Sequence, residues 1–162
     1  MAQTTNVMRL LTAANLAFGT RSYDPAITDG MLVAQALGEN PEQVFKTLVT
    51  EADGGVGTGG HGSVHFVFVV PVNCSLDLKK AARTAGVKSI QMIKQKELLP
   101  LTGYIHGGCS PIGMKKPFKT FIEESATLYE SIFVSAGQVG HQIEIDPQVL
   151  KEYVGADFAD LV

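Results

Sequence analysis

Cysteine is scarce in this sequence of 162 residues, and its scarcity excludes two classes of protein. Two cysteines, Cys74 and Cys109, are too few for a disulfide-stapled scaffold. Neither belongs to a cysteine–histidine cluster with the spacing of a zinc site, so we expect no metal and no cofactor. A reducing compartment suits such a chain, and we expect a cytoplasmic protein.

Long apolar runs are absent as well, although hydrophobic residues make up 45% of the chain. The first 18 residues lack the charged start and the apolar stretch of a secretory signal. No segment reaches the roughly 20 apolar residues that span a bilayer. We therefore expect a soluble protein with no membrane partner, folded as one domain over residues 1–162.

Positive charge is in the minority, with a net charge of −3, but it is concentrated in one part of the chain. Between Lys79 and Lys119 there are nine basic residues and one acidic residue, Glu97, so this segment carries +8. The remainder has four basic and fifteen acidic residues, or −11. Such a segment favours a phosphate backbone as its partner, although a solvated helix face has the same composition.

Hydrophobic periodicity predicts an α+β fold, a small distorted mixed β-sheet or barrel flanked by short helices. Helices are expected over residues 5–16, 31–38, 76–86, 95–103 and 147–155. Strands are expected over residues 18–24, 43–51, 65–72, 89–93, 119–125, 131–137 and 141–146, with 156–162 as a tail. The second and third strands should form a hairpin, whose tip would be the glycine-rich segment 54–62. No helix and no Gly-Lys-Ser/Thr follows these glycines, so they do not indicate a phosphate loop.

Lys46 is out of place in the strand that contains it. Alternation turns Val44, Lys46 and Leu48 to one side, and both sides of this strand are otherwise apolar. A charge held there costs free energy unless it is paired or offered to a ligand, which makes Lys46 a candidate functional residue. A lysine whose stem follows the sheet to solvent is the alternative.

The stretch GYIHGGCSPIGMKKPF, residues 103–118, suggests two kinds of site. Cys109 with His106 would form a nucleophile and base, but no nearby aspartate or asparagine could orient the imidazole, so we expect Cys109 to be a loop residue. Gly107, Gly108 and Pro111 instead describe a fixed turn whose backbone N–H groups can bind an oxygen. The remaining histidines, His61, His65 and His141, are scattered along the chain.

Four segments together resemble the YbaK family of free-standing aminoacyl-tRNA deacylases, which is related to the editing domain of bacterial prolyl-tRNA synthetase. These segments are VFKTLVTE, LDLKKAA, LLPLTGYIHGGCSPIGMKK and ESIFVSAGQVG. The resemblance covers nearly the whole chain. Its most specific parts are the Phe-Lys-Thr strand at Lys46 and the Gly-x-x-x-Pro loop from Gly107 to Pro111.

The resemblance implies a small barrel with external helices and a site for an aminoacyl group. Lys46 would be the essential lysine and Gly107 the loop glycine, with the amides of Gly107 and Gly108 facing the developing oxyanion. Tyr23, Thr47, Pro111 and Ser135 would complete the substrate pocket. Asp29 falls where relatives carry an aromatic residue, and the glycine-rich tip is longer than the connection usual in the family.

The activity implied by the resemblance is trans-editing, the hydrolysis or release of cysteine from misacylated Cys-tRNA(Pro). In this family the thiol of the substrate attacks its own carbonyl, so no protein nucleophile is required. The implied partners are the acceptor end of the tRNA and prolyl-tRNA synthetase in a transient complex. A non-catalytic module that binds an aminoacyl group or docks on a synthetase would have a similar sequence.

Overall fold

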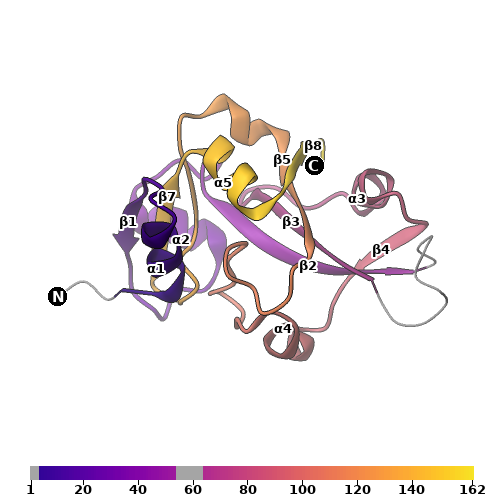
Figure 1. Ribbon diagram of the computed structural model, residues 1–162, viewed down its shortest axis with the longest axis horizontal. Helices are drawn as coiled ribbons and strands as arrows, with labels where there is room; N and C mark the ends of the chain where they lie inside the picture. The colour runs from indigo at the N-terminus through magenta and orange to yellow at the C-terminus, as the bar shows by residue number, and fades with distance from the viewer. Residues whose placement is uncertain (1–3, 54–63) are drawn as a thin grey trace.

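The computed structural model describes residues 4–53 and 64–162, and its strands form two sheets (Figure 1). The larger sheet has the strand order β4-β2-β3-β5-β8, and the smaller has the order β1-β7-β6. The strands are β1 Gly19–Ser22, β2 Phe45–Asp53, β3 Val64–Pro71, β4 Ser89–Met92, β5 Lys119–Glu123, β6 Ile132–Ser135, β7 His141–Ile145 and β8 Asp157–Ala159. The larger sheet contains antiparallel and parallel pairs, so the expected α+β class with a mixed sheet is confirmed.

The β2–β3 hairpin forms the centre of the larger sheet. The two strands pair antiparallel from Phe45 opposite Pro71 to Ala52 opposite Val64, which confirms the expected hairpin. Its strands are rich in valine and phenylalanine, and the side chains of residues 67–70 are fully buried. A strand that is covered on both faces has a continuous apolar sequence, because the side chains on both of its faces are buried. The predicted tip 54–62, with His61, lies outside the described residues.

Short helices surround the sheets, and their ends follow from local capping. They are α1 Asn6–Ala13, α2 Gly30–Leu37, α3 Leu78–Ala85, α4 Gln95–Thr102 and α5 Pro147–Val154, with a 3₁₀-helix η1 Glu124–Leu128. At the start of α2 the Asp29 carboxylate accepts a hydrogen bond from the Leu32 amide, 3.2 Å away. The helix ends at Gly38, whose φ of 68° lies in the left-handed region. An acidic N-cap and a C-terminal glycine satisfy the exposed backbone groups at the two ends of a helix.

The prediction of a tail after Gly155 is wrong. Asp157–Ala159 form β8, which pairs parallel to β5 at the edge of the larger sheet. The Lys119 ammonium lies 2.7 Å from the Asp157 carboxylate across this pair, and Leu161 is fully buried. Three residues are too few for a periodic pattern, and their partner strand lies far back in the chain, so only tertiary packing defines this strand.

The first turn of α2 packs on the end of β3 at a point where only glycine fits. A Cβ atom on Gly30 would lie 2.6 Å from Val72 Cγ1 and 2.9 Å from Val72 Cβ. This close approach sets the position of Asp29 and of the residues that precede it. The packing of α2 therefore depends on the volume of one valine.

Gly30→Ala is expected to lower the free energy of unfolding by about 1–3 kcal/mol, because overpacking outweighs the roughly 1 kcal/mol that alanine gains over glycine in a helix. Denaturant unfolding measures the effect. A second change, Val72→Ala, should restore part of the loss. Gly19→Ala is the control, since its Cβ would make an ordinary contact of 3.5 Å with Glu144. A Gly30→Ala protein as stable as the wild type would contradict this account.

Candidate active site

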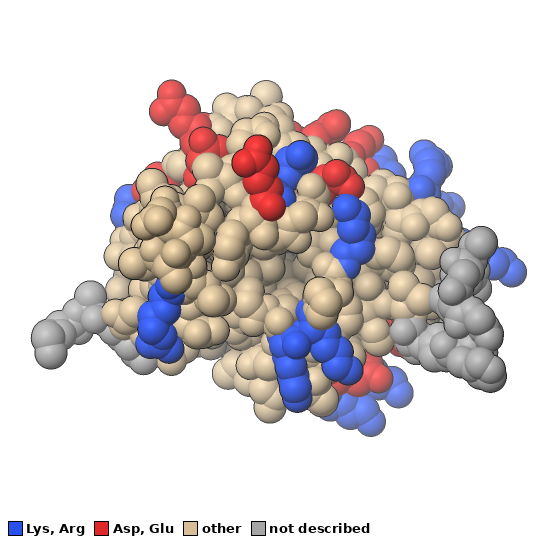
Figure 2. Space-filling model, viewed as in Figure 1, with Lys and Arg blue, Asp and Glu red and all other residues tan. Residues whose placement is uncertain are grey.

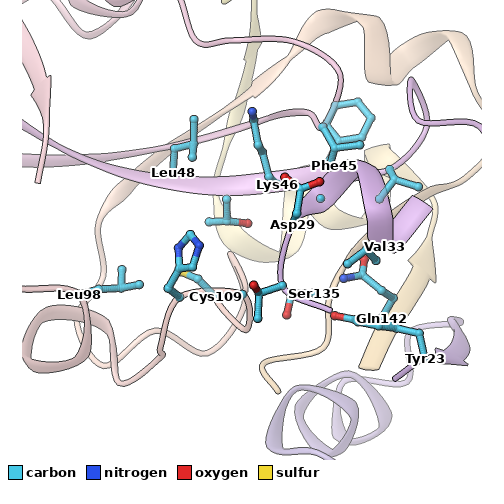
Figure 3. A pocket seen from close by; sticks show the side chains of 17 residues that line it. Tyr23, Asp29, Val33, Phe45, Lys46, Leu48, Leu98, Cys109, Ser135 and Gln142 are labelled. Atoms are coloured by element: carbon cyan, nitrogen blue, oxygen red, sulfur yellow. The ribbon is translucent and has the colours of Figure 1, made fainter. Parts of the chain in front are cut away.

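A cavity of about 330 Å³ lies where β2, the start of α2, the smaller sheet and the loop after α4 meet (Figure 3). Its lining consists of Tyr23, residues 28–30, Val33, residues 44–48, Val72, Leu98, His106, Gly107, Cys109, Ser135 and Gln142. The volume is at the lower end of the range for small-molecule sites. The cavity is therefore of a size to take one small group rather than a long chain.

Most of the residues predicted from the sequence come together in this cavity, although they come from four separate parts of the chain. Those in the lining are Tyr23, Lys46, Thr47, Gly107 and Ser135. The other two, Gly108 and Pro111, are buried beside it and do not line it. Their placement is a result of the fold, and the catalytic roles stay predictions.

The Gly108 amide is not available for the oxyanion role that the sequence predicted. Its N–H donates a hydrogen bond to the carbonyl oxygen of Ile105, 3.0 Å away. A Cβ atom at this position would lie 3.0 Å from the backbone nitrogen of Val139. Glycine is required here because the loop packs directly on the turn before β7, so Gly108 positions the loop rather than contacting a ligand.

Gly107 differs from Gly108 in the availability of its amide and in its position, although both lack room for a side chain. Among the described residues its amide has no hydrogen-bond partner, and the residue lines the cavity. Its φ of 88° is in the left-handed region, and a Cβ atom would lie 3.1 Å from Thr28. A side chain is therefore disfavoured twice, by the backbone conformation and by the close approach of Thr28.

The loop that carries Gly107 is shaped by Tyr104. The Tyr104 hydroxyl donates a hydrogen bond to the carbonyl oxygen of Ile112, and the Tyr104 amide donates to Thr102 Oγ1, 3.0 Å away. Burial raises the pKa of the Tyr104 phenol to about 12, so the hydroxyl keeps its proton and remains a donor. These bonds hold the loop in place without a ligand.

Lys46 lines the cavity from β2, between buried Val44 and half-buried Leu48 on the same side of the strand. It forms no ion pair with any acidic group of the described chain. Asp29 lies on the same side of the cavity in Figure 3, while Ser135 and Gln142 lie on the other side. One Asp29 oxygen is used to cap α2. The cavity therefore has one side with charged groups and one with neutral polar groups.

Unpartnered polar atoms are concentrated in this cavity. Within residues 4–53 and 64–162, four buried side-chain atoms have no hydrogen-bond partner, and three of them belong to the lining. These three are Tyr23 Oη, Thr47 Oγ1 and Gln142 Oε1. A buried polar group without a partner costs about 1–3 kcal/mol, so such a concentration indicates a site prepared for a polar ligand.

Sequence reasoning missed Gln142, which is only 5% exposed. It lies in β7, in the sequence HQIEI, on the same side of the strand as Glu144, while Ile143 and Ile145 lie on the other side. The sequence therefore placed Gln142 on the polar side of the strand and gave no signal that it is buried. Alternation by itself does not say whether that face of the strand is covered.

Cys109 is present in the lining but is not an activated nucleophile. The residue is 9% exposed, and burial raises the pKa of its thiol to about 12, although a hydrogen bond with Thr102 acts in the opposite direction. His106 is exposed and makes no hydrogen bond with the thiol. The thiol therefore stays protonated at neutral pH, in agreement with its assignment as a loop residue.

Comparison with known proteins identifies the class to which this fold and cavity belong. A family model described as the aminoacyl-tRNA editing domain matches residues 25–153. This match covers most of the sequence, so the chain belongs to that family, and the resemblance inferred from its motifs is confirmed. None of the helices in the described residues is long and apolar enough to span a membrane.

Individual relatives agree with this assignment. EbsC of Enterococcus faecalis, named as a candidate Cys-tRNA(Pro)/Cys-tRNA(Cys) deacylase, is 40% identical over 163 residues, which cover 98% of this chain and 93% of the relative. A proline–tRNA ligase of Shouchella clausii is 26% identical over 129 residues, 79% of this chain and 21% of the ligase. The similarity to the ligase thus extends over only a part of that longer protein.

Solved structures share the fold. A crystal structure described as a candidate trans-editing enzyme for prolyl-tRNA synthetase aligns with a TM-score of 0.79 and 24% identity, over 99% of this chain and 98% of that one. A hypothetical protein aligns with a TM-score of 0.85 and 20% identity, over 97% and 99% of the two chains. These two structures support the architecture of two sheets with short external helices.

The raised pKa of Cys109 predicts slow alkylation. At pH 7.5 we expect iodoacetamide to modify half-buried Cys74 more than about tenfold faster than Cys109, because the thiolate is the reactive form. The Cys109 rate should keep rising with pH through pH 10, without a plateau, because its pKa lies higher still. Peptide mass spectrometry measures both rates, and unfolding in urea should make them similar. Faster modification of Cys109 in the folded protein would restore the nucleophile hypothesis.

Proposed function

We propose that this chain works as a free-standing, single-domain editing enzyme that deacylates misacylated tRNA in the cytoplasm, with Cys-tRNA(Pro) as its substrate. The observation that carries the proposal is the cavity itself. Among the described residues it places a lysine without an ion pair, a loop amide and three unpartnered polar atoms around the volume of a small group, in a chain of the aminoacyl-tRNA editing family. The name of the Enterococcus relative, a candidate Cys-tRNA(Pro)/Cys-tRNA(Cys) deacylase, supports Cys-tRNA(Pro) as the substrate.

A separate editing site has a physical reason. Amino acids that differ by a small apolar group are distinguished by only about 1–3 kcal/mol of binding free energy, so a synthetase that accepts proline also charges cysteine or alanine. The ester that results is already an activated acyl group. An enzyme that positions it well and stabilises the developing negative charge can release the amino acid.

The residues of the cavity suit this chemistry. We assign Lys46 to hold the polar groups of the aminoacyl ester, and the Gly107 amide to stabilise the oxyanion. The protonated Cys109 does not attack. Instead the substrate thiol forms a bond to its own acyl carbon, the ester bond to the ribose breaks, and the thiol proton goes to the leaving ribose oxygen. Water then opens the cyclic thioester that results, which gives free cysteine. Intramolecular attack in a fixed geometry provides a large effective concentration.

The basic segment of the chain is the proposed contact for the acceptor end of the tRNA. Lys and Arg side chains gather over α4 and the loop beside it in Figure 2, while acidic side chains lie mainly over α5 and the segment before it. Both α4 and this loop contribute to the cavity lining, through Leu98 and Gly107. Lys80 and Lys119 are instead paired with Asp160 and Asp157. We infer that the phosphate contacts come from the basic residues nearest the cavity.

Lys46→Ala is expected to lower the rate of Cys-tRNA(Pro) deacylation by about 100-fold or more, the size of effect seen when one group that stabilises a transition state is removed. The fold should survive, because the lysine makes no ion pair in the described chain. Single-turnover release of cysteine and a thermal melt measure the two effects. Lys151→Ala on α5, outside the lining, is the matched control. Unchanged turnover in folded Lys46→Ala protein would refute the assignment.

This assay also separates an enzyme from a non-catalytic module of the same fold. A binding module would retain Cys-tRNA(Pro) without releasing cysteine, whatever residue stands at position 46. The assay needs purified protein and no metal or cofactor.

Binding of tRNA is expected to weaken steeply with salt, because each phosphate that the protein neutralises releases counterions. Neutralising Lys115 or Lys116 to glutamine should reduce the slope of log affinity against log salt by about 0.7–0.9 per lost contact. Lys80→Gln is the matched control, because Lys80 is already paired with Asp160. Salt-independent binding, or tRNA affinity unchanged in Lys115→Gln and Lys116→Gln, would mean that the segment is only a solvated face.

Prolyl-tRNA synthetase is the proposed partner that selects the tRNA. The net charge of −3 should keep the affinity of this chain for tRNA modest on its own. Repeating the salt series with the synthetase present should raise deacylation of Cys-tRNA(Pro) at a salt concentration where the chain by itself has released the tRNA.

A further inference from the structure

Gln142 lies in the middle strand of the smaller sheet, where no group of the described protein pairs with its side-chain oxygen. Strand β7 lies between β1 and β6, with Gln142 opposite Arg21 on one side and Ser135 on the other. The residue is 5% exposed and belongs to the cavity lining, and its Oε1 atom has no hydrogen-bond partner. A buried acceptor of this kind favours a bound group that brings a donor.

The arrangement of charges indicates which part of an aminoacyl ester would reach this acceptor. Lys46 and Asp29 lie on the other side of the cavity (Figure 3). The α-ammonium of the substrate suits the Asp29 carboxylate, and the carbonyl oxygen suits Lys46 and the Gly107 amide. The acyl side chain is then directed to the neutral side of the cavity.

Ser135 is the neighbour of Gln142 on that side, and its hydroxyl oxygen already has a hydrogen-bond donor. Ser135 Oγ accepts a hydrogen bond from the Gly137 amide, 3.1 Å away, whereas the Gln142 oxygen accepts none from the described chain. A thiol or hydroxyl group can donate a hydrogen bond to the Gln142 oxygen, whereas a methyl group cannot.

On this geometry, and resting on the proposed function, we propose that Gln142 is a specificity-determining residue. Its amide oxygen accepts a hydrogen bond from the thiol or hydroxyl of the bound acyl side chain. The cavity therefore favours cysteinyl and seryl groups over alanyl groups at the binding step, before any bond is broken. A site built to pair with a donor discriminates against the analogue without one, because its own buried group is then left unpaired.

Stable amides test recognition without the chemical step. The probes are 3′-deoxyadenosines that carry cysteine, serine or alanine in a 3′-amide, titrated into the full chain and followed by NMR. We expect the wild type to bind the cysteinyl and seryl amides about tenfold more tightly than the alanyl amide. In Gln142→Met, which keeps the length of the side chain and removes the acceptor, these two should weaken about tenfold, and the alanyl amide should bind as before.

Gln148→Met is the matched control, because Gln148 is exposed on α5 and outside the lining. It should keep the preference of the wild type. Equal affinity of the wild type for the three amides overturns the inference, even if Gln142→Met does not fold. A preference that persists in folded Gln142→Met also overturns it.

Deacylation of Cys-tRNA(Pro) by the same preparations tests the proposed function separately. Release of cysteine together with equal amide affinities would refute the role of Gln142 and support the proposed deacylase function. A preference for donor-bearing amides without any release of cysteine would refute the proposed deacylase function and support the role of Gln142 in recognition.

Discussion

The site depends on a backbone bridge between the two sheets. Val44, immediately before β2, forms a parallel bridge with Phe133 of β6, and the Phe133 amide donates to the carbonyl oxygen of Gln43, 3.0 Å away. This contact places the start of β2 against the smaller sheet. Because strand side chains project at fixed intervals, the bridge sets Lys46 across a cavity from Ser135. A shift of one residue in this contact would turn the lysine to the other face.

The loop after α4 completes the cavity by close backbone packing. Gly108 lies against the turn before β7, and Gly107 lies against Thr28 before α2. The hydrogen bond from Tyr104 to Ile112 closes the loop on itself. The amide of Gly107 is therefore held in place at the cavity wall without a ligand.

The polar groups of the cavity are also in place without a ligand. Tyr23, Thr47 and Gln142 each have a buried polar atom without a partner in the described part of the chain, a state that a purely structural core avoids. The surface charge is organised differently, since part of the basic segment is neutralised by ion pairs of Lys119 with Asp157 in β8 and of Lys80 with Asp160 just after it. Three of the four unpartnered buried atoms in residues 4–53 and 64–162 lie in the cavity, where an aminoacyl group would supply the missing partners.

The sequence by itself determined the features that depend on neighbours along the chain. The expected helix over residues 31–38 and the alternation that marked Lys46 both depend on residues close along the chain, and the structure shows each of them in place. Tertiary structure decided the rest. Strand β8 exists because a parallel partner is present, the Gly108 amide is occupied because the loop folds back to Ile105, and Gln142 is a site residue because its face of β7 lines a cavity. Alternation shows that a strand has two faces, but which face is covered, and by what, depends on segments distant in the sequence.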